Sequence, residues 1–582
     1  MNDKKLLLSV KDLEVKFRVR GRILTAIRNI SLDIYEGESI AIVGESGSGK
    51  SVFTKTFAGM LDSNGFISSG ELVFDDDVLA DTSVKLDNSA RAKIESIEKR
   101  LNEYSKLEAG AATYNEIQKL EAEKESKAHI SAEEKEKTEA EIKELIARKT
   151  DIFNLKQTFD PSKEKDRIKK AAKEIADLEE KIKAKEAQAK KHEAEKKHAA
   201  AADSEYLKQY HEKLARLKAK YHEETSHEIN EKTRQRNKLL AKEIYLSVGR
   251  YNPFKRNKMI AGLEKAFMKA FRIGVDVENE DDRNGVFNNV TFRVKFTDET
   301  EDKLHGNCVI DLAKIKEQKD WTQIRGNRIA TVFQDPMTSL NPIITIGKQI
   351  TSVILKHQNC SESEARHRAL DLMRKVGIPN AEHRFDDYPF QYSGGMRQRI
   401  VIAIALSCQP KILICDEPTT ALDVTIQAQI LQLIKDLQKE FGYTIVFITH
   451  DLGVVANVAD RVAVLYAGQV IELGTVEDVF YDPRHPYTWA LLSSLPQLAQ
   501  RNTQLYSITG TPPSLYNKIT GDSFAPRNPY CLRVDTLYEP PMFKISDTHY
   551  AKTWLLDPRS PKISKPEAIE NIHEKLINAF NI

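Results

Sequence analysis

The spacing of apolar residues divides the chain into segments of strand-like pattern and one long segment of helical pattern. Residues 1–78 and 309–495 alternate β-type apolar runs with Gly-rich turns, as the buried strands of an α/β domain do. From about Asn88 to Leu246 the chain is rich in Lys, Glu and Ala, has few Gly or Pro, and spaces apolar residues alternately by three and four. The pattern predicts an α/β domain in two parts, separated by long helices.

Residues 79–253 are expected to form an antiparallel helical hairpin, or coiled coil. Its apolar seam includes Ile94, Ile97, Leu101, Tyr104, Leu207, Tyr210, Leu214, Leu217 and Tyr221. Asp160-Pro161-Ser162 would end one arm and begin the next, because Pro breaks a helix interior and Asp or Ser can cap a new start. Only alanines occupy the expected apolar positions between Lys185 and Ala202, so separate solvated helices are the alternative.

Two smaller parts complete the predicted organisation. Residues 254–308 combine an amphipathic helix over Phe254–Phe271 with strand-like alternation over 286–296, which indicates a small α+β part of the insertion. Residues 496–582 are Pro-rich and end in a predicted helix from about Pro566 to Phe580. This last segment is expected to be an appended small domain.

Charge and hydropathy exclude several classes of protein. With 88 Lys+Arg and 86 Asp+Glu, the formal net charge is +2, which does not fit a polybasic nucleic-acid coat or an acidic disordered chain. Apolar runs such as Lys411–Cys415 are far shorter than the ~20 residues of a membrane-spanning helix. Met1–Val10 holds only three consecutive leucines, too few for the core of a signal peptide, so the chain is expected to stay in the cytoplasm.

The cysteines indicate neither a disulfide framework nor a zinc site. They are five, an odd number, and none forms a CxxC pair. Reduced, mostly buried thiols are expected at Cys308, Cys360, Cys408, Cys415 and Cys531.

A phosphate-binding loop lies between the apolar run Ser39–Val43 and a helical pattern that begins near Val52. Its sequence, Gly44-Glu-Ser-Gly-Ser-Gly-Lys-Ser51, matches GxxxxGK[ST] in the strand–loop–helix context that the loop requires. Glycines let backbone N–H groups curve around the β-phosphate, Lys50 reaches the β- and γ-phosphates, and Ser51 offers its hydroxyl to Mg²⁺. The predicted nucleotide-binding residues are Gly44, Glu45, Ser46, Gly47, Ser48, Gly49, Lys50, Ser51 and Val52.

A second apolar strand, Lys411–Cys415, ends in two carboxylates. Asp416 would hold the Mg²⁺ shell, directly or through water, and Glu417 would polarise the attacking water. On its own, an apolar strand that ends in Asp-Glu is often only a strand whose end is exposed to solvent. Together with the loop at Gly44 it predicts a nucleotide hydrolysis site.

A third element, Tyr392–Arg399, places Ser393, Gly394 and Gly395 at the start of a helical run. A helix N-terminus with small residues is a second anion site, although the sequence does not say for which phosphate. With this element the chain resembles an ATP-binding-cassette (ABC) ATPase, a family in which the signature of one subunit closes over the ATP held by its partner.

The resemblance implies further site residues. Phe17 lies where the family has an aromatic that stacks on adenine, and Gln334 fits the glutamine that senses the γ-phosphate, metal and membrane partner. Ala421-Leu-Asp423 fits the D-loop, so Asp423 is included in the site, and His450 fits the switch histidine. The implied catalytic residues are Glu417, His450 and Gln334, and the implied Mg²⁺ ligands are Ser51, Gln334 and Asp416.

Longer matches resemble the D-type ATPase subunit of oligopeptide and dipeptide importers. They are Val43–Val52, Phe333–Pro342, Ser393–Arg399, Cys415–Gln427, His485–Pro496 and Gly510–Pro513. The implied fold class is α/β: an ABC-type P-loop cassette with an antiparallel β subdomain and a helical signature subdomain, interrupted by the hairpin and followed by a small C-terminal extension.

The implied function is that of an ATPase that binds ATP and Mg²⁺ and powers peptide uptake. The implied partners are an F-type ATPase subunit as heterodimer, two transmembrane permeases and an extracellular peptide-binding lipoprotein, without nucleic acid. The protein would be peripheral, on the cytoplasmic face of the cell membrane.

The chain departs from this subfamily in its extension and in its insertion. Family members commonly carry four cysteines in the extension, proposed to hold an iron–sulfur cluster, and the aligned residues here are Asp522, Asn528, Asp535 and Thr553. Cys531 is out of register, so no cluster is expected. Residues from about 79 to 308 have no counterpart in ordinary members.

A coiled-coil ABC ATPase that acts on chromosomes or ribosomes is the alternative function. In chromosome-maintenance ATPases the coiled coil normally enters after the Q-loop, whereas this one precedes Gln334, and the bend at Asp160-Pro161 lacks a CxxC zinc hook. Translation-associated members generally carry two cassettes in one chain. The role of the hairpin stays open between a docking or regulatory arm and a tolerated solvated expansion.

Overall fold

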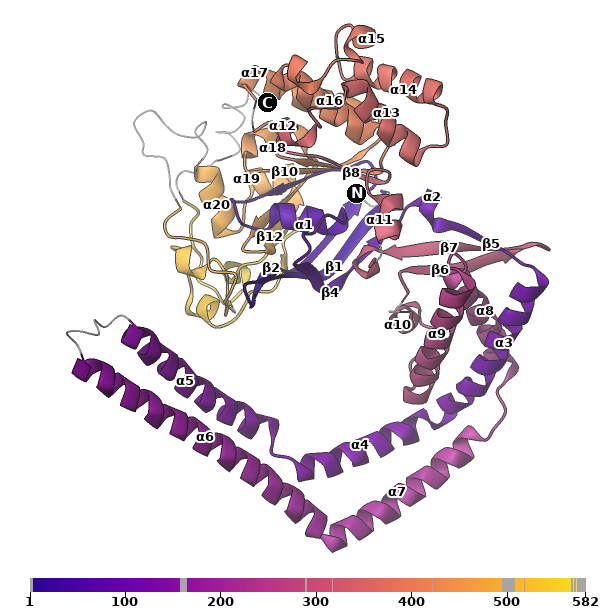
Figure 1. Cartoon of the computed structure of the whole chain (residues 1–582), viewed down its shortest axis with the longest axis vertical. Coiled ribbons are helices and arrows are strands. Elements are labelled where there is room, and N and C mark those ends of the chain that lie inside the picture. The colour runs from indigo at the N-terminus through magenta and orange to yellow at the C-terminus, as the bar shows by residue number, and fades with distance from the viewer. Residues whose placement is uncertain are drawn as a thin grey trace. The chain divides into compact units, whose positions relative to one another are not determined.

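The computed structural model describes most of the chain, in two compact units (Figure 1). The described residues are 4–157, 165–287, 290–316, 318–420, 422–494, 508–517, 519–566, 569 and 572. The first unit comprises Met1–Thr82, Val290–Lys295 and Gly306–Ile582, and the second comprises Ser83–Asn289 and Phe296–His305.

An antiparallel sheet forms one layer of the first unit. Strand β1 (Leu6–Val19) lies between β2 (Arg22–Tyr35) and β4 (Gly65–Phe74), and β4 pairs in turn with the end of β7 (Lys303–Asp311). Buried residues alternate with more exposed ones over Leu13–Phe17 of β1 and Ile30–Ile34 of β2, as expected of a sheet with one buried face. This is the antiparallel β subdomain that the resemblance implies.

A mainly parallel sheet forms the other layer. Its strand order is β13-β14-β12-β11-β3-β10-β9-β8. The strands are β3 (Ser39–Val43), β8 (Ile329–Val332), β9 (Ile412–Asp416), β10 (Thr444–Thr449), β11 (Arg461–Tyr466), β12 (Gln469–Thr475), β13 (Phe543–Lys544) and β14 (Tyr550–Ala551). All residues of β3 and β10 are buried, because helices cover both faces of a parallel sheet.

Helices cover this sheet and build a separate helical layer (Figure 1). They are α1 (Lys50–Phe57), α2 (Asp77–Ala80), α11 (Gln318–Ile324), α12 (Pro336–Ser339), α13 (Ile346–His357), α14 (Glu362–Lys375), α15 (Ala381–Arg384), α16 (Gly394–Leu406), α17 (Val424–Phe441), α18 (Leu452–Val458), α19 (Val476–Tyr481) and α20 (Pro486–Ser493). The apolar faces of α13, α14, α16 and α17 share one core with the sheet, which includes Ile350, Ile402 and Phe447.

The C-terminal extension belongs to the same core. Phe524 is buried with residues of the cassette, and so are Ile569 and Ile572, which are the only described residues between 567 and 582. The predicted helix from Pro566 to Phe580 therefore lies almost wholly outside the described residues. Strand β14 pairs with β12, so the extension also lengthens the sheet.

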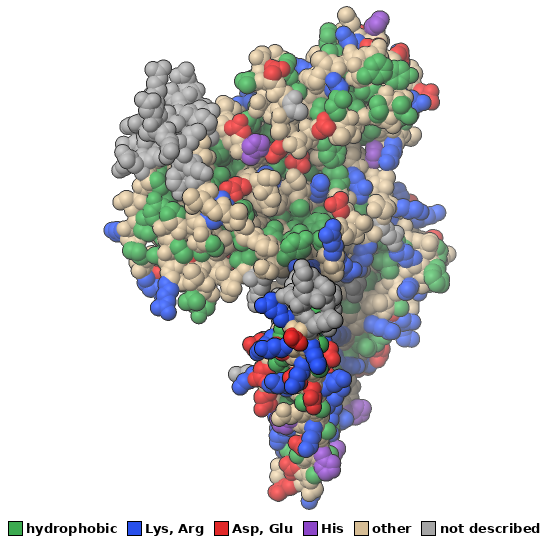
Figure 2. All heavy atoms as spheres, turned by 60° about the vertical axis from the view of Figure 1, so that its left-hand side comes forward, with side chains coloured by type: hydrophobic (Ala, Val, Ile, Leu, Met, Phe, Trp, Pro, Cys, Tyr) green, Lys and Arg blue, Asp and Glu red, His purple; other side chains and the backbone are tan. Residues whose placement is uncertain are grey.

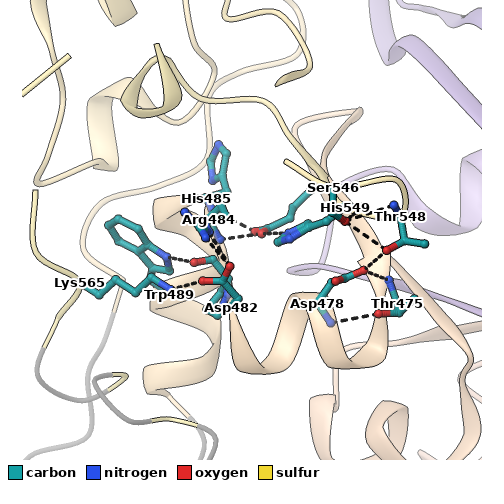
Figure 3. A network of polar contacts seen from close by, with 12 residues as sticks. Thr475, Asp478, Asp482, Arg484, His485, Trp489, Ser546, Thr548, His549 and Lys565 are labelled. Atoms are coloured by element: carbon teal, nitrogen blue, oxygen red, sulfur yellow. Dashed lines mark hydrogen bonds and ion pairs between the residues drawn. The ribbon is translucent and has the colours of Figure 1, made fainter. Parts of the chain in front are cut away.

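Hydrogen bonds fix the extension to β12 and α19 (Figure 3). Glu472 of β12 accepts hydrogen bonds from the backbone N–H of Arg484 at 2.6 Å and of His485 at 3.0 Å, and its Oε1 lies 2.9 Å from Nε2 of His549. Thr548 Oγ1 donates to Asp478 Oδ2 at 2.8 Å. Since Glu472 and His549 are buried, the extension is part of the folded cassette and not a loose tail.

The second unit is mostly helical. Its elements are α3 (Asn88–Ser105), α4 (Ala111–Ala128), α5 (Ala132–Gln157), α6 (Lys165–Ala202), α7 (Ser204–Thr225), α8 (Glu231–Val248), α9 (Pro253–Ile273), α10 (Glu280–Val286), most of β5 (Asp81–Lys85), the second part of β6 (Phe292–Glu299) and the first part of β7. Helix α4 packs on α7, and α5 on α6, so the helices pair as a hairpin (Figure 1). The predicted break at Asp160-Pro161-Ser162 lies outside the described residues.

Each arm of the hairpin consists of several helices. Asp203 Oδ1 accepts a hydrogen bond from Tyr206 N at 3.0 Å and starts α7, and Asn230 Oδ1 accepts one from Thr233 N at 2.8 Å and starts α8. These caps give the chain new helix starts, which heptad spacing alone did not reveal.

The hydrophobic core of this unit becomes smaller along the hairpin. Near α3, α8 and α9 it includes buried Leu101, Ile244 and Phe267, whereas the α4–α7 pair buries one small cluster of Ile117, Leu120, Tyr210 and Leu217. Lys, Arg, Asp and Glu side chains crowd the hairpin surface (Figure 2). No helix among the described residues is long and apolar enough to cross a membrane.

Candidate active site

The phosphate loop joins β3 to α1 and curves around Lys50. Gly44, Gly47 and Gly49 have φ of 154°, 80° and 104°, which L side chains rarely adopt. A Cβ at Gly44 would lie 2.2 Å from the carbonyl oxygen of Leu465. Lys50 Nζ donates to the carbonyl oxygens of Gly44 at 2.7 Å and Glu45 at 3.0 Å, so the ammonium group sits inside the curve.

Burial lowers the pKa of Lys50, because an ammonium group loses hydration in a site where the side chain is 6% exposed. The charges of Glu417, Asp416 and Glu45 oppose this shift. A desolvated cation within a loop of backbone N–H groups is suited to a polyanionic ligand.

Asp416 ends β9 beside Ser51, the first-turn hydroxyl of α1. Ser51 Oγ donates to Asp416 Oδ1 at 3.2 Å. Burial raises the pKa of Asp416, and the hydrogen bond from Ser51 opposes the rise. A hydroxyl and a half-buried carboxylate in contact are the oxygen donors that Mg²⁺ takes in nucleotide sites, so these two residues fit that cation.

Glu417 is held by three side chains. Gln334 Nε2 donates to Glu417 Oε2 at 2.9 Å, Thr420 Oγ1 donates to the same oxygen at 3.1 Å, and His450 Nδ1 lies 3.1 Å from Glu417 Oε1. The structure therefore brings together the three predicted catalytic residues, Glu417, His450 and Gln334. They follow β9, β10 and β8, whose carboxyl ends meet at one edge of the parallel sheet.

The backbone at Glu417 is strained. Its φ is 46°, in the left-handed region that non-glycine residues seldom occupy, and its N–H donates to the carbonyl oxygen of Ile448 at 2.9 Å. Such strain clusters at functional sites, where the surroundings hold it in place. Thr420 was not singled out from the sequence; a hydroxyl three residues after Glu417 was the available signal.

The predicted signature lies at the start of α16. Ser393 Oγ accepts a hydrogen bond from Met396 N at 3.3 Å and caps the helix, and Ser393 and Gly394 are exposed. A Cβ at Gly395 would lie 2.7 Å from Ile426 Cγ2, so α16 packs closely on α17 there. Asp423 is exposed and caps α17 through Ile426 N at 3.1 Å, whereas Ala421 lies outside the described residues.

Phe17 lies in β1 with its side chain against β4. Its ring is 9% exposed, and a Cβ at Gly65 would lie 2.7 Å from Phe17 Cε1. The predicted stacking of this ring on adenine stays a prediction.

Four polar residues of the extension each stabilise a local turn. Each accepts a hydrogen bond from a nearby backbone N–H group. Asp522 accepts one from Phe524 at 3.0 Å, and Asn528 accepts one from Tyr530 at 2.9 Å. Asp535 accepts one from Leu532 at 2.5 Å, and Thr553 accepts one from Leu555 at 3.3 Å. All four side chains are buried. The extension is thus stabilised here by short-range polar contacts of this chain's own residues.

The phosphate loop around Lys50, the carboxylates at the end of β9, the contacts of Gln334 and His450 with Glu417, and the capped start of α16 are the features of a P-loop ATPase with an ABC-type cassette. The ABC transporter family model matches residues 27–250 and 294–420, and the chain belongs to that family. A second family model, for the C-terminal region of oligopeptide/dipeptide transporters, matches residues 471–533.

Curated relatives agree with these matches. The chain is 64% identical over 266 residues to the oligopeptide transport ATP-binding protein AmiE of Streptococcus pneumoniae serotype 4, which covers 46% of this chain and 75% of that protein. It is 58% identical over 271 residues to the oligopeptide transport ATP-binding protein OppD of Bacillus subtilis, with 46% and 75% covered. It is 56% identical over 265 residues to the dipeptide transport ATP-binding protein DppD of Lactococcus lactis subsp. cremoris, with 45% and 75% covered.

Proposed function

We propose that the chain is the ATP-binding and ATP-hydrolysing subunit of an importer that carries oligopeptides or dipeptides across the cell membrane. One observation carries the proposal: the ATPase cassette is joined to a C-terminal region that matches oligopeptide/dipeptide transporters over residues 471–533. The relatives named above, at 56–64% identity, are ATP-binding proteins of peptide transport.

In this proposal the loop at Gly44–Ser51 takes the phosphates of ATP. Lys50, whose ammonium group now donates to two loop carbonyls, would exchange them for phosphate oxygens. Ser51, Asp416 and Gln334 would hold Mg²⁺, which when bound neutralises charge on the β- and γ-phosphates.

Glu417 acts as the general base of hydrolysis. A water oxygen attacks the γ-phosphorus, the bond to the bridging oxygen of ADP breaks, and Glu417 accepts a proton from the water. Gln334, Thr420 and His450 orient the carboxylate through the hydrogen bonds described above. Because three partners fix its position, little reorganisation is needed when water enters.

Ser393, Gly394, Gly395 and Asp423 would act on the ATP of a second cassette. Ser393 and Gly394 are exposed at the N-terminus of a 13-residue helix, a place where backbone N–H groups can meet a phosphate. The partner would be an F-type ATPase subunit, and both would bind two permeases that receive peptide from an extracellular lipoprotein. The chain would therefore be peripheral, on the cytoplasmic face of the membrane.

Action on chromosomes or ribosomes is the rejected alternative. It would explain a helical insertion, but it gives no reason for a C-terminal region of the peptide-transporter type.

Affinity purification from native membranes tests the proposal. The wild-type chain and Glu417→Gln should both recover a second ABC ATPase and two permeases, and the variant should lose ATP hydrolysis. Glu440→Gln, an exposed carboxylate paired with Lys375, is the matched control and should behave as wild type. Recovery of DNA-bound complexes or ribosomes without permeases would overturn the transport function and leave the ATPase assignment intact.

A further inference from the structure

An arginine of the C-terminal extension forms an ion pair with the phosphate loop. Arg527 Nη1 donates to Glu45 Oε2 at 2.8 Å, and Nη2 donates to Glu45 Oε1 at 3.1 Å. The Arg527 side chain is 5% exposed and that of Glu45 is 27% exposed. Two parallel N–H···O bonds from one guanidinium fix both the position and the orientation of the carboxylate.

The surroundings of Arg527 hold it toward the loop. Its Nε donates to the carbonyl oxygen of Thr509 at 3.1 Å, and its Nη1 also donates to the hydroxyl of Tyr466 at 3.3 Å. Hydrogen bonding to Glu45 raises the pKa of Arg527, so the guanidinium is charged throughout the accessible pH range. With these contacts Arg527 cannot turn to solvent without losing several hydrogen bonds.

The backbone of Glu45 is fixed from the same side. Its N–H donates to the hydroxyl of Tyr487 at 2.8 Å, and Tyr487 is fully buried in α20. Phe524 of the extension packs against the rings of Tyr466 and Tyr487, with centroids 5.2 and 5.4 Å apart. The extension and α20 therefore determine where the second residue of the loop lies.

Glu45 is an unfavourable neighbour for ATP unless its charge is compensated. Its carbonyl oxygen accepts a hydrogen bond from Lys50 at 3.0 Å, so the residue lies directly beside the ammonium group that would meet the phosphates. The charge of the Glu45 carboxylate also acts on the Lys50 ammonium group, and it would repel a polyanion bound to that group. Arg527, a residue of the C-terminal extension, compensates that charge.

We infer that Arg527 is a positioning residue for ATP binding: it neutralises Glu45 and holds the phosphate loop, so the C-terminal extension sets the ATP affinity of the cassette. The inference rests on the proposed placement of ATP at Gly44–Ser51. It gives the extension a role in the ATPase cycle that needs no metal cluster.

The test measures the dissociation constant of Mg-ATP by calorimetry with the purified full chain. Arg527→Gln should weaken ATP binding about tenfold, because a nearby charge is left uncompensated. Glu45→Gln keeps the loop backbone and removes only the repelling charge, so it should bind ATP more tightly than wild type. Glu45→Gln with Arg527→Gln should return to within about threefold of wild type. Arg559→Gln, an exposed arginine of the same extension, is the matched control and should leave the constant unchanged.

Lys50→Ala separates the inference from the proposed function. If Lys50→Ala binds ATP like wild type, the loop is not the ATP site and both fail. If Lys50→Ala abolishes binding while Arg527→Gln binds like wild type, only the inference fails. Weak binding by Glu45→Gln, or no recovery in the double variant, shows a purely structural contact and overturns the inference, even where Arg527→Gln alone does not fold.

Discussion

The C-terminal extension and the helical second unit are stabilised in different ways. The extension shares the cassette core through Phe524, Ile569 and Ile572, and buries polar contacts such as Glu472–His549. In the second unit, α4 and α7 share a small cluster of their own, and α5 and α6 are joined by exposed ion pairs such as Arg148–Glu174.

This difference predicts which segment can influence ATP. A segment that shares a close-packed core transmits a change in its side chains to its neighbours, because interiors deform little. Exposed ion pairs contribute little to stability and are screened by salt. We therefore expect changes in the extension to alter the phosphate loop, and changes in α4–α7 to remain local.

The largest effect is expected at the active site, and the other expected effects are compared with it. Glu417→Gln keeps the size of the side chain but removes the base, so ATP hydrolysis should fall by about 10²- to 10⁴-fold while ATP binding persists. Phosphate release and calorimetry measure the two quantities. A hydrolysis rate within the range of the Glu440→Gln control would contradict the assigned role.

A pair of core truncations tests the comparison directly. Phe524→Ala should lower the free energy of unfolding of the cassette by about 3–5 kcal/mol, because Phe524 is 1% exposed and leaves a cavity. It should also weaken ATP binding, since Tyr466 and Tyr487 lose their support. Thermal unfolding and calorimetry measure these effects.

Leu217→Ala is the matched truncation in the hairpin, where the side chain is 9% exposed. It should cost about 2 kcal/mol or more locally and speed hydrogen exchange in α4 and α7, with ATP affinity unchanged. If it weakens ATP binding as much as Phe524→Ala does, the proposed difference between the two regions is wrong.

Asp522 gives the extension a pH-dependent stability. Burial raises the pKa of Asp522 from 3.8 to about 6, and the charge of Asp535 adds to the rise. Between these pH values the folded chain holds a proton that the unfolded chain has lost, so the free energy of unfolding falls as pH increases from about 4 to about 6.

Asp522→Asn should therefore be more stable than wild type at pH 8, by up to about 3 kcal/mol, and equal to it below about pH 4. The amide oxygen can still accept the hydrogen bond from Phe524 N. Unfolding midpoints across this pH range measure the difference. A variant that is less stable at pH 8 than wild type would contradict the proposed cost of the buried charge.

The smallest effect is expected from a shortened hairpin. Lys127 Nζ lies 3.6 Å from the ring centroid of Tyr206, so the end of α4 and the start of α7 are neighbours. A short Gly-Ser linker in place of residues 129–203 should retain the Leu217 cluster and change ATP affinity and hydrolysis less than about twofold. Loss of permease recovery with unchanged hydrolysis would identify the removed helices as a docking arm.

Sequence reasoning predicted the parts of the site that lie close to strand ends. The apolar runs before Gly44 and Asp416 predicted the phosphate loop and the carboxylate site, because parallel strands bring their carboxyl ends to one edge. Gln334 and His450 were implied by the resemblance to ABC ATPases. Thr420 was missed because many hydroxyls follow strands, and only the turn geometry singles this one out.

Long-range contacts and helix breaks could not be predicted from the sequence. Arg527 and Glu45 are 482 positions apart, and no local pattern links them. The burial of Phe17 depends on its pairing with β4, which includes Gly65. Heptad spacing predicted the helices of the hairpin, but not that caps such as Asp203 would divide its arms.

Uptake of a labelled oligopeptide shows whether transport depends on ATP hydrolysis at Glu417. Cells whose only copy of this chain is wild type or Glu440→Gln should accumulate the peptide, and cells with Glu417→Gln should not, while uptake of a free amino acid by other systems stays the same. Equal peptide accumulation with Glu417→Gln would contradict the account, because transport would then not depend on ATP hydrolysis at this site.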